Sequence, residues 1–273
     1  MIITTNLRKM KTALDGDAQY TLPIVNILDH DGLFYMNPLV GSEITLRFEN
    51  EIHCVETGKK IKKTFGEGLS YDAFLKSPMA SPSIVRPELS RIHEGIALRD
   101  YEWEMAHHNQ PHFVYLSRTS DIKVGVTRDT NVPSRWIDQG ATEAIILTQT
   151  PYRQLAGLIE VELKESMADK TNWQAMLKNI SHDQTPLDQK KNDVLNLLSP
   201  EFESFIYDDD SVTKIQYPVL NYPAKVKSMK LDTTPEYTGK LTGIKAQYLM
   251  FEDGTVFNVR SHAGYRMSII YNE

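Results

Sequence analysis

The stretch of sequence that decides the fold is residues 112–177, HFVYLSRTSDIKVGVTRDTNVPSRWIDQGATEAIILTQTPYRQLAGLIEVELKESMADKTNWQAML. Two runs of alternating and β-branched residues, 113–116 and 122–127, predict strands, and the polar turn between them suits a hairpin. Pro133 predicts a helix start, because proline lacks the N–H that the first helical turn leaves unpaired. Gly140 predicts the end of that helix as a left-handed cap.

A third strand and a longer helix complete this stretch. The apolar run over residues 144–148 favours a strand that is buried on both faces. Residues 152–168 predict an amphipathic helix, because apolar side chains recur there at helical spacing. The order of strands and helices is typical of an α/β sandwich with a small three-stranded sheet.

Composition limits the class of protein. The chain has 273 residues, 41% of them hydrophobic, and a net charge of -6, so no global basic field indicates a nucleic-acid binder, although a local basic patch is compatible with these values. Cys54 is the single cysteine, which excludes an intramolecular disulfide and a cysteine-rich metal site. Neither a secretory signal nor an apolar run of membrane-spanning length is visible, so we expect a cytoplasmic protein without a membrane partner.

We predict an α+β protein that consists of four parts. These are a β-rich N-terminal domain with an irregular connector (residues 1–110), the central α/β domain (111–180), a helical linker (181–213) and a C-terminal β segment (214–273). Hairpin turns are predicted at residues 31–32, 49–50 and 253–254, where turn-forming residues separate β-type runs. We expect the C-terminal strands to pair with the N-terminal ones, and the sequence leaves the oligomeric state open.

Side chains suited to phosphate chemistry are spread over the central stretch. Tyr115 and Lys123 stand on neighbouring predicted strands and can face one side. A nearby cation lowers the pKa of a phenol, which makes Tyr115 a candidate general base. Arg128 and Arg135 suit bidentate contact with phosphate. Glu160 is the candidate ligand of Mg²⁺ or Mn²⁺, since one carboxylate and water can hold such an ion beside a phosphate.

Each of these residues also has an ordinary structural interpretation. A strand tyrosine such as Tyr115 usually packs, and Lys123 is most simply a solvent-facing strand residue. Glu160 stands four residues before Lys164, the spacing of a helix ion pair. His108 and His112 can share a helix face and bind a metal, but no carboxylate or cysteine pattern accompanies them, so we expect no zinc there.

The tripeptides VYL and KVG, an arginine-bearing helix and a helix with a central glutamate resemble the GIY-YIG nuclease superfamily. The resemblance places its signature tyrosine on Tyr115, its second-motif glycine on Gly125, its arginine on Arg135 and its metal-binding glutamate on Glu160. Lys123 stands where the second tyrosine is expected, a replacement known in some members. The resemblance covers about residues 113–177.

A longer resemblance covers nearly the whole chain. The segments VYLSRTSDIKVGVTR, PSRWIDQGA, DKTNW and TGKLTGIKAQYL…GTVFNVRSHAGY are similar to an uncharacterised bacterial family known only as a domain of unknown function. Its better-known members carry a cysteine-rich segment, interpreted as zinc-binding. Here Cys54 alone matches it, while Thr57, Ser70 and Ala73 lie about where further cysteines are expected, so this resemblance implies that the zinc site has been lost.

The predicted function is metal-dependent phosphodiester hydrolysis of a nucleic acid, with DNA or RNA undetermined. Tyr115 and Lys123 are the predicted catalytic pair, Arg128 and Arg135 hold phosphate, and Glu160 binds the metal. The alternatives are a non-catalytic nucleic-acid-binding module and a protein-interaction module on the same scaffold.

Overall fold

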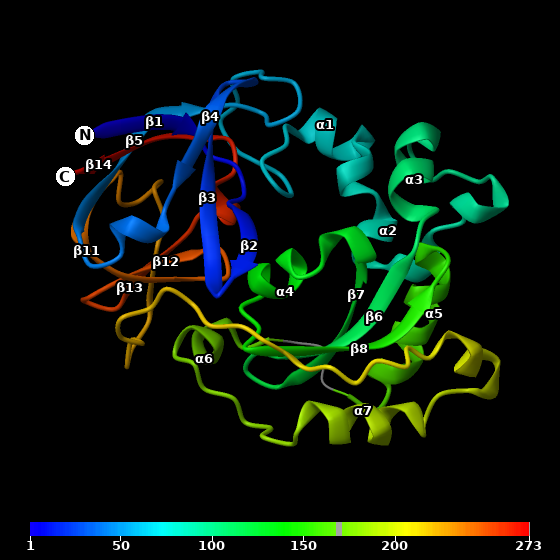
Figure 1. Cartoon of the computed structure of the whole chain (residues 1–273). Helices are drawn as coiled ribbons and strands as arrows, with labels where there is room; N and C mark the ends of the chain where they lie inside the picture. Colours follow the sequence, from blue (N-terminus) through cyan, green and yellow to red (C-terminus); the bar gives the residue numbers. More distant parts are fainter. Residues whose placement is uncertain (168–170, 273) are drawn as a thin grey trace. The chain divides into compact units, whose positions relative to one another are not determined.

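The computed structural model describes residues 1–167 and 171–272, and its fold is α+β (Figure 1). The chain divides into two compact units. Unit 1 comprises residues 1–75, 137–140 and 216–273, and unit 2 comprises residues 76–136 and 141–215. The predicted C-terminal β segment therefore groups with the N-terminal strands, and the predicted helical linker groups with the central domain.

Unit 1 is built on a seven-stranded sheet with the order β1-β14-β5-β11-β12-β13-β10 and a three-stranded sheet with the order β2-β3-β4. Its strands are β1 (Ile2–Asn6), β2 (Lys11–Asp15), β3 (Asp17–Asn26), β4 (Asp29–Tyr35), β5 (Glu43–Ile52), β10 (Lys227–Met229), β11 (Glu236–Lys245), β12 (Tyr248–Phe251), β13 (Thr255–Asn258) and β14 (Tyr265–Tyr271). The first strand pairs with the last, and β5 lies between β14 and β11. The prediction that the two ends of the chain pair is confirmed.

Two of the three hairpin turns predicted for this unit are wrong. The β3–β4 turn lies at Ile27 and Leu28, whereas Asp31 is an extra residue in a bulge of β4, next to Gly32. Residues 49–50 form no hairpin turn, because β5 continues through them to Ile52. They lie where the β5–β14 register shifts, and Asn50 adopts a positive φ of 57°. The turn at residues 253–254 is confirmed, since it joins β12 to β13 and Gly254 adopts the positive φ of 83° that such a turn favours.

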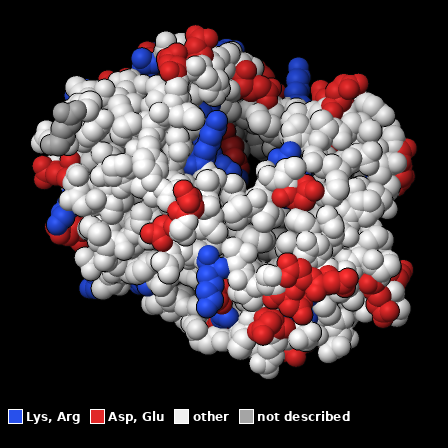
Figure 2. Space-filling view, in the orientation of Figure 1, with Lys and Arg blue, Asp and Glu red and all other residues white. Residues whose placement is uncertain are grey.

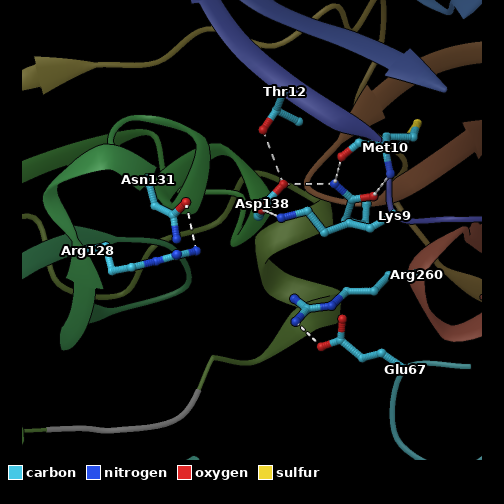
Figure 3. A network of polar contacts seen from close by, with 9 residues as sticks. Lys9, Met10, Thr12, Glu67, Arg128, Asn131, Asp138 and Arg260 are labelled. Carbon is cyan, nitrogen blue, oxygen red and sulfur yellow. Dashed lines mark hydrogen bonds and ion pairs between the residues drawn. The ribbon is translucent and has the colours of Figure 1, made fainter. Parts of the chain in front are cut away.

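A buried carboxylate fastens residues 137–140 to the rest of unit 1 (Figure 3). Asp138 forms an ion pair with Lys9, and it accepts hydrogen bonds from Thr12 Oγ1 at 3.2 Å and from Gln247 Nε2 at 2.8 Å. The amide of Gln247 also bonds both backbone groups of Met10. A buried charge is tolerated when it is paired and hydrogen-bonded in this way.

Unit 2 contains a four-stranded antiparallel sheet with the order β7-β6-β8-β9. Its strands are β6 (His112–Arg118), β7 (Ile122–Arg128), β8 (Glu143–Thr150) and β9 (Thr213–Lys214). The three longer strands confirm the predicted ones, while β9, with two residues, is too short to be recognised in a sequence. Val114, Leu116 and Val124 pack with the inner face of α5 (Arg153–Lys164) and with α7 (Leu187–Leu195), which lie along this sheet in Figure 1.

The other α-helices are α1 (Tyr71–Lys76), α2 (Pro82–Val85), α3 (Tyr101–His108), α4 (Ser134–Asp138) and α6 (Trp173–Leu177). Short 3₁₀ turns are η1 (Asn37–Leu39), η2 (Pro78–Ala80), η3 (Pro87–Leu89), η4 (Ile92–Glu94), η5 (Asp129–Asn131), η6 (Pro200–Phe205) and η7 (Arg260–His262). The predicted helix after Pro133 is α4, and Gly140 follows it at a φ of 75°. The helix predicted over residues 152–168 is shorter, since α5 ends at Lys164. Ala168 and the first residues of the DKTNW motif, Asp169 and Lys170, lie outside the described residues. None of the helices in residues 1–167 and 171–272 is long and apolar enough to cross a membrane.

Candidate functional site

The ladder between β6 and β7 fixes the first two candidate residues. Tyr115 lies opposite Gly125, and Ser117 lies opposite Lys123. Residues two apart in a strand share a face, so Tyr115 and Lys123 stand on the same side of the sheet, as predicted from the sequence. Val114, Leu116 and Val124 occupy the other side, where α5 and α7 pack.

Tyr115 is sealed inside unit 2. Its exposed fraction is 0%, its ring makes an edge contact with Trp136 at 5.9 Å between centroids, and Trp136 is itself only 2% exposed. The phenol also covers Gly125, where an added Cβ would lie 2.8 Å from the phenol oxygen. A general base must reach the proton that it abstracts, so this burial argues against the predicted role of Tyr115.

Lys123 is half-buried on β7. Burial lowers its pKa to about 8, and the nearby positive charges of Arg135 and Lys164 act in the same direction. Glu160 acts in the opposite direction. Within residues 1–167 and 171–272, Lys123 has neither a hydrogen-bond partner nor an ion-pair partner.

Glu160 lies on α5, on the turn that also carries the buried Gly157. It is 7% exposed and forms an ion pair with Lys164 at 3.3 Å. Burial raises the pKa of Glu160, and the ion pair with Lys164 only partly offsets that effect. The structural interpretation of this pair as a helix ion pair is therefore confirmed by the geometry, while metal binding by Glu160 stays a prediction.

Arg153 is a neighbour of the candidates that the sequence did not single out. It is the first residue of α5, and its guanidinium donates to the backbone oxygens of Ser83 at 2.9 Å and Ile84 at 3.0 Å. Burial lowers the pKa of Arg153 to about 10, and Arg135 is the largest of the neighbouring charges that contribute. The sequence offered no signal for this role, because Arg153 reads as an ordinary cation at a helix start.

We define the cation cluster as Lys123, Arg128, Arg135, Arg153 and Lys164. Lys123 interacts electrostatically with Arg135, Lys164 and Glu160, and Arg153 interacts with Arg135, Arg128 and Glu160. Burial also lowers the pKa of Arg128, whose guanidinium contacts Asn131 Oδ1 at 3.5 Å (Figure 3). Three of the predicted residues, Lys123, Arg135 and Glu160, thus lie within reach of one another's charge, and Arg128 is linked to them through Arg153.

The cation cluster is local. Figure 2 shows acidic and basic side chains interspersed over one face, with no continuous basic surface among the residues drawn in colour. Two arginines and two carboxylates, Glu160 and Glu88, act on Arg153, whereas Arg135 and Lys164 act on Lys123 against one carboxylate, so cations are in excess around Lys123. Such an excess favours an anion.

Two neutral histidines lie beside the cluster. Burial lowers the pKa of His108 to about 3 and that of His112 to about 4, and Arg153 and Arg128 contribute to both shifts. The prediction that these histidines share a helix face is wrong, because His108 ends α3 and His112 begins β6. His112 Nδ1 bonds Gln110 O at 2.7 Å, while its Nε2 is buried without a hydrogen-bond partner among the described residues.

A divalent metal fits this surrounding poorly. Across residues 1–167 and 171–272 no group of three or more histidine, cysteine or acidic side chains is arranged to hold a metal ion. Glu160 already faces Lys164, and its other charged neighbours include Arg153. Mg²⁺ and Mn²⁺ prefer several oxygen ligands, whereas cations surround this carboxylate.

The positions where the family resemblance expects cysteines come together in unit 1. The Ser70 N–H donates to Cys54 Sγ at 3.2 Å, and the Ala73 N–H donates to Ser70 Oγ at 3.2 Å. Burial works to raise the pKa of Cys54, but hydrogen bonds from Thr57 and Ser70, with one from the Glu56 backbone, outweigh it and lower the pKa to about 7. Ser70 and Ala73 lie at the start of α1, and Thr57 follows β5.

Comparison with known proteins assigns no activity. No curated protein and no solved structure matches the chain. A family model described as "Protein of unknown function (DUF2797)" matches residues 41–267, which is well over half of the chain.

Proposed function

The chain belongs to the DUF2797 family of proteins of unknown function, and from its geometry we propose that unit 2 binds the phosphate groups of a nucleic acid through the cation cluster. The observation that carries this proposal is the concentration of partly buried cations around the ion-paired Glu160. Taking cations such as Lys123 and Arg153 out of water is costly, and a bound anion would offset part of that cost.

Phosphate is the anion that suits these side chains best. Arg128 and Arg135 present planar guanidinium groups, which bind two phosphate oxygens at once, while Lys123 and Lys164 act as point charges. A nucleic acid offers successive phosphates to such a cluster. The resemblance of residues 113–177 to the GIY-YIG nuclease superfamily also supports a nucleic acid over other phosphate-bearing molecules.

Metal-dependent hydrolysis is the second candidate, and that same resemblance favours it. Glu160 stands at the position of the superfamily's metal-binding glutamate, and Mg²⁺ or Mn²⁺ there is part of this candidate. The burial of Tyr115 and the ion pair of Glu160 with Lys164 count against it. Binding without cleavage is therefore the function that the geometry supports best.

Binding of a labelled oligonucleotide over a series of salt concentrations tests the proposal. The Arg128→Gln and Arg135→Gln variants should weaken binding and lower the salt slope by about one unit for each lost phosphate contact. Arg91→Gln is the matched control, because Arg91 is exposed in the same unit and pairs with Glu94. Affinity that is absent, or that is equal in all variants, would favour a protein-interaction module.

Cleavage is assayed with the same oligonucleotides and added Mg²⁺ or Mn²⁺. Degradation that requires the ion and disappears in Glu160→Ala would favour hydrolysis over binding alone. Salt-dependent binding without degradation is the result we expect.

A further inference from the structure

Strand β4 is an edge strand of the three-stranded sheet in unit 1, where the order is β2-β3-β4 (Figure 1). It pairs with β3 along one side, and no other strand in residues 1–167 and 171–272 pairs with its second side. Proteins usually protect such an edge against pairing with another chain by means of charges, prolines or bulges. The opposite edge strand of the same sheet, β2, carries Lys11 and Asp15.

Only the first half of β4 has protection of this kind. It contains the exposed carboxylates of Asp29 and Asp31, and Asp31 is the extra residue of the bulge. The second half, residues 32–35, carries no charge. Leu33 there is 60% exposed and Tyr35 is 47% exposed, so two large apolar side chains stand beside an open sheet edge.

The hydrogen bonds to β3 show which backbone groups face the open edge. Met36 N–H donates to Tyr20 O at 2.9 Å, so the backbone groups of Met36 point towards β3. Successive residues of an antiparallel strand point their backbone groups to opposite sides, so those of Tyr35 and Leu33 point away from β3. Pro23, which lies opposite Leu33, agrees with this assignment because it has no N–H to donate. The open edge therefore presents the N–H and C=O groups of Leu33 and Tyr35.

We propose that this edge pairs with β4 of a second copy of the chain, in antiparallel orientation and with the two-fold axis at Phe34. In that register Leu33 of one protomer lies opposite Tyr35 of its partner, and the two residues exchange both of their backbone hydrogen bonds. The symmetry repeats this pair, and the two three-stranded sheets become one continuous sheet. The inference concerns unit 1 and makes no use of the cation cluster.

The short open edge matches its own copy. The symmetric register uses both outward-pointing residues of each chain, and it makes Leu33 and Tyr35 an apolar cross-strand pair of the kind that stabilises sheets. Asp29 and Asp31 fall outside the paired segment, so no carboxylate faces a carboxylate of the partner. A register centred on Leu33 would set Tyr35 opposite the bulged Asp31. One centred on Tyr35 would set Leu33 opposite Asn37, which lies beyond the strand in η1.

Sedimentation equilibrium of the full chain over a range of concentrations tests the pairing. The contact is small, so we expect a dimer that dissociates on dilution. Leu33→Lys places a charge on the paired edge and should raise the dissociation constant of the dimer at least about tenfold. Leu75→Lys is the matched control and should leave this constant unchanged, because Leu75 is also an exposed leucine of unit 1, at 51%, but lies on α1.

Cysteine cross-linking tests the register. The Cα atoms of a hydrogen-bonded antiparallel pair are about 5.5 Å apart, which a disulfide can span. A mixture of Leu33→Cys and Tyr35→Cys should therefore form a cross-linked dimer on mild oxidation. Either variant alone should form little, because each position lies about 8 Å from its own copy, too far for a disulfide. The wild type is the control, since its one cysteine, Cys54, is buried.

The two measurements stand independently, because the cross-link does not depend on the folding of Leu33→Lys. A dimer that Leu33→Lys weakens, together with a cross-link that forms only in the mixture, would support the inference. A chain that stays monomeric at every concentration would overturn it. So would a dimer that is equally stable in Leu33→Lys, or cross-linking that is as efficient in each cysteine variant alone as in the mixture.

Discussion

Tyr115 lies directly opposite Gly125 in the β6–β7 ladder, and its phenol occupies the space that a side chain at position 125 would need. The tyrosine and the glycine therefore form one packing unit, and Trp136 makes an edge contact with the tyrosine ring. This packing explains why a glycine lies opposite a tyrosine in this strand pair, and it requires no catalytic role for the phenol.

Gly125→Ala should destabilise unit 2 by about 1–3 kcal/mol, because Tyr115 is fully buried and cannot move aside. Urea denaturation measures this loss. Gly239→Ala is the matched control, since a Cβ there would also lie 2.8 Å from a tyrosine oxygen, but Tyr237 is only half-buried and can swing outward. Equal losses in the two variants would show that Tyr115 is not held rigidly.

Glu160→Gln separates phosphate binding from metal-dependent cleavage. It removes the negative charge that lies among the cations, so it should strengthen oligonucleotide binding about two- to tenfold. Glutamine keeps the size of the side chain and can still accept a hydrogen bond from Lys164. Fluorescence anisotropy at constant salt measures the change in affinity.

Glu165→Gln serves as the control, because Glu165 follows α5 and is exposed. If Glu160→Gln weakens binding in the presence of Mn²⁺ and leaves it unchanged with chelator, the glutamate holds a metal, and the simple phosphate-binding proposal is wrong.

The two buried histidines should make the protein sensitive to acid. Their folded-state pKa values, about 3 for His108 and about 4 for His112, lie below the unfolded value of 6.5. Below pH 6.5 the unfolded chain therefore binds protons that the folded chain excludes, and stability falls as the pH drops toward 4. Each histidine contributes a slope of up to about 1.4 kcal/mol per pH unit in that window.

Replacing each histidine with glutamine should flatten this slope. The measurement is the free energy of unfolding in urea at pH 4.5 and pH 7, followed by tryptophan fluorescence, in His108→Gln and His112→Gln. His30→Gln is the control, because His30 is exposed on β4. A wild type whose stability is the same at both pH values would contradict the assignment of two neutral histidines.

Local patterns predicted unit 2 better than unit 1. The β6–β7 hairpin, β8 and α5 follow from alternation and helical spacing within a few residues, and Trp136 is the core anchor that its type suggests. The turn predicted at residues 31–32 was wrong because Asp-Gly also suits a bulge, and only the pairing with β3 decides between the two. Strand β5 was divided in two because its partners lie near the other end of the chain.

For the candidate site, too, the sequence predicted local relationships and not contacts between distant residues. Residues that share a strand pair, such as Tyr115 and Lys123, could be placed on one face by counting. The burial of Tyr115 depends on α4, and the position of Arg153 depends on carbonyls about seventy residues earlier in the chain. Neither contact leaves a periodic signal in the sequence.

The last prediction concerns the segment around Cys54 in unit 1, and we call Cys54, Thr57, Ser70 and Ala73 the Cys54 corner. Cys54, Thr57, Ser70 and Ala73 are linked by hydrogen bonds, and N–H groups already point at the Cys54 sulfur. Backbone donors of this kind stabilise a thiolate, the form in which cysteine binds zinc. The lost zinc site implied by the family resemblance therefore needs only its ligands, and the backbone that would carry them is present.

The triple variant Thr57→Cys/Ser70→Cys/Ala73→Cys should bind one zinc ion per chain, because four thiolates at this corner complete a tetrahedral site. Zinc content after gel filtration and the thermal midpoint with and without chelator measure the effect, and the midpoint should rise only with zinc, since binding to the folded state alone stabilises it. The same variant with Cys54→Ser lacks one ligand and should bind zinc much more weakly. If the triple variant folds but takes up no more zinc than the wild type, the four positions do not form a metal corner, and the segment owes its shape to packing alone.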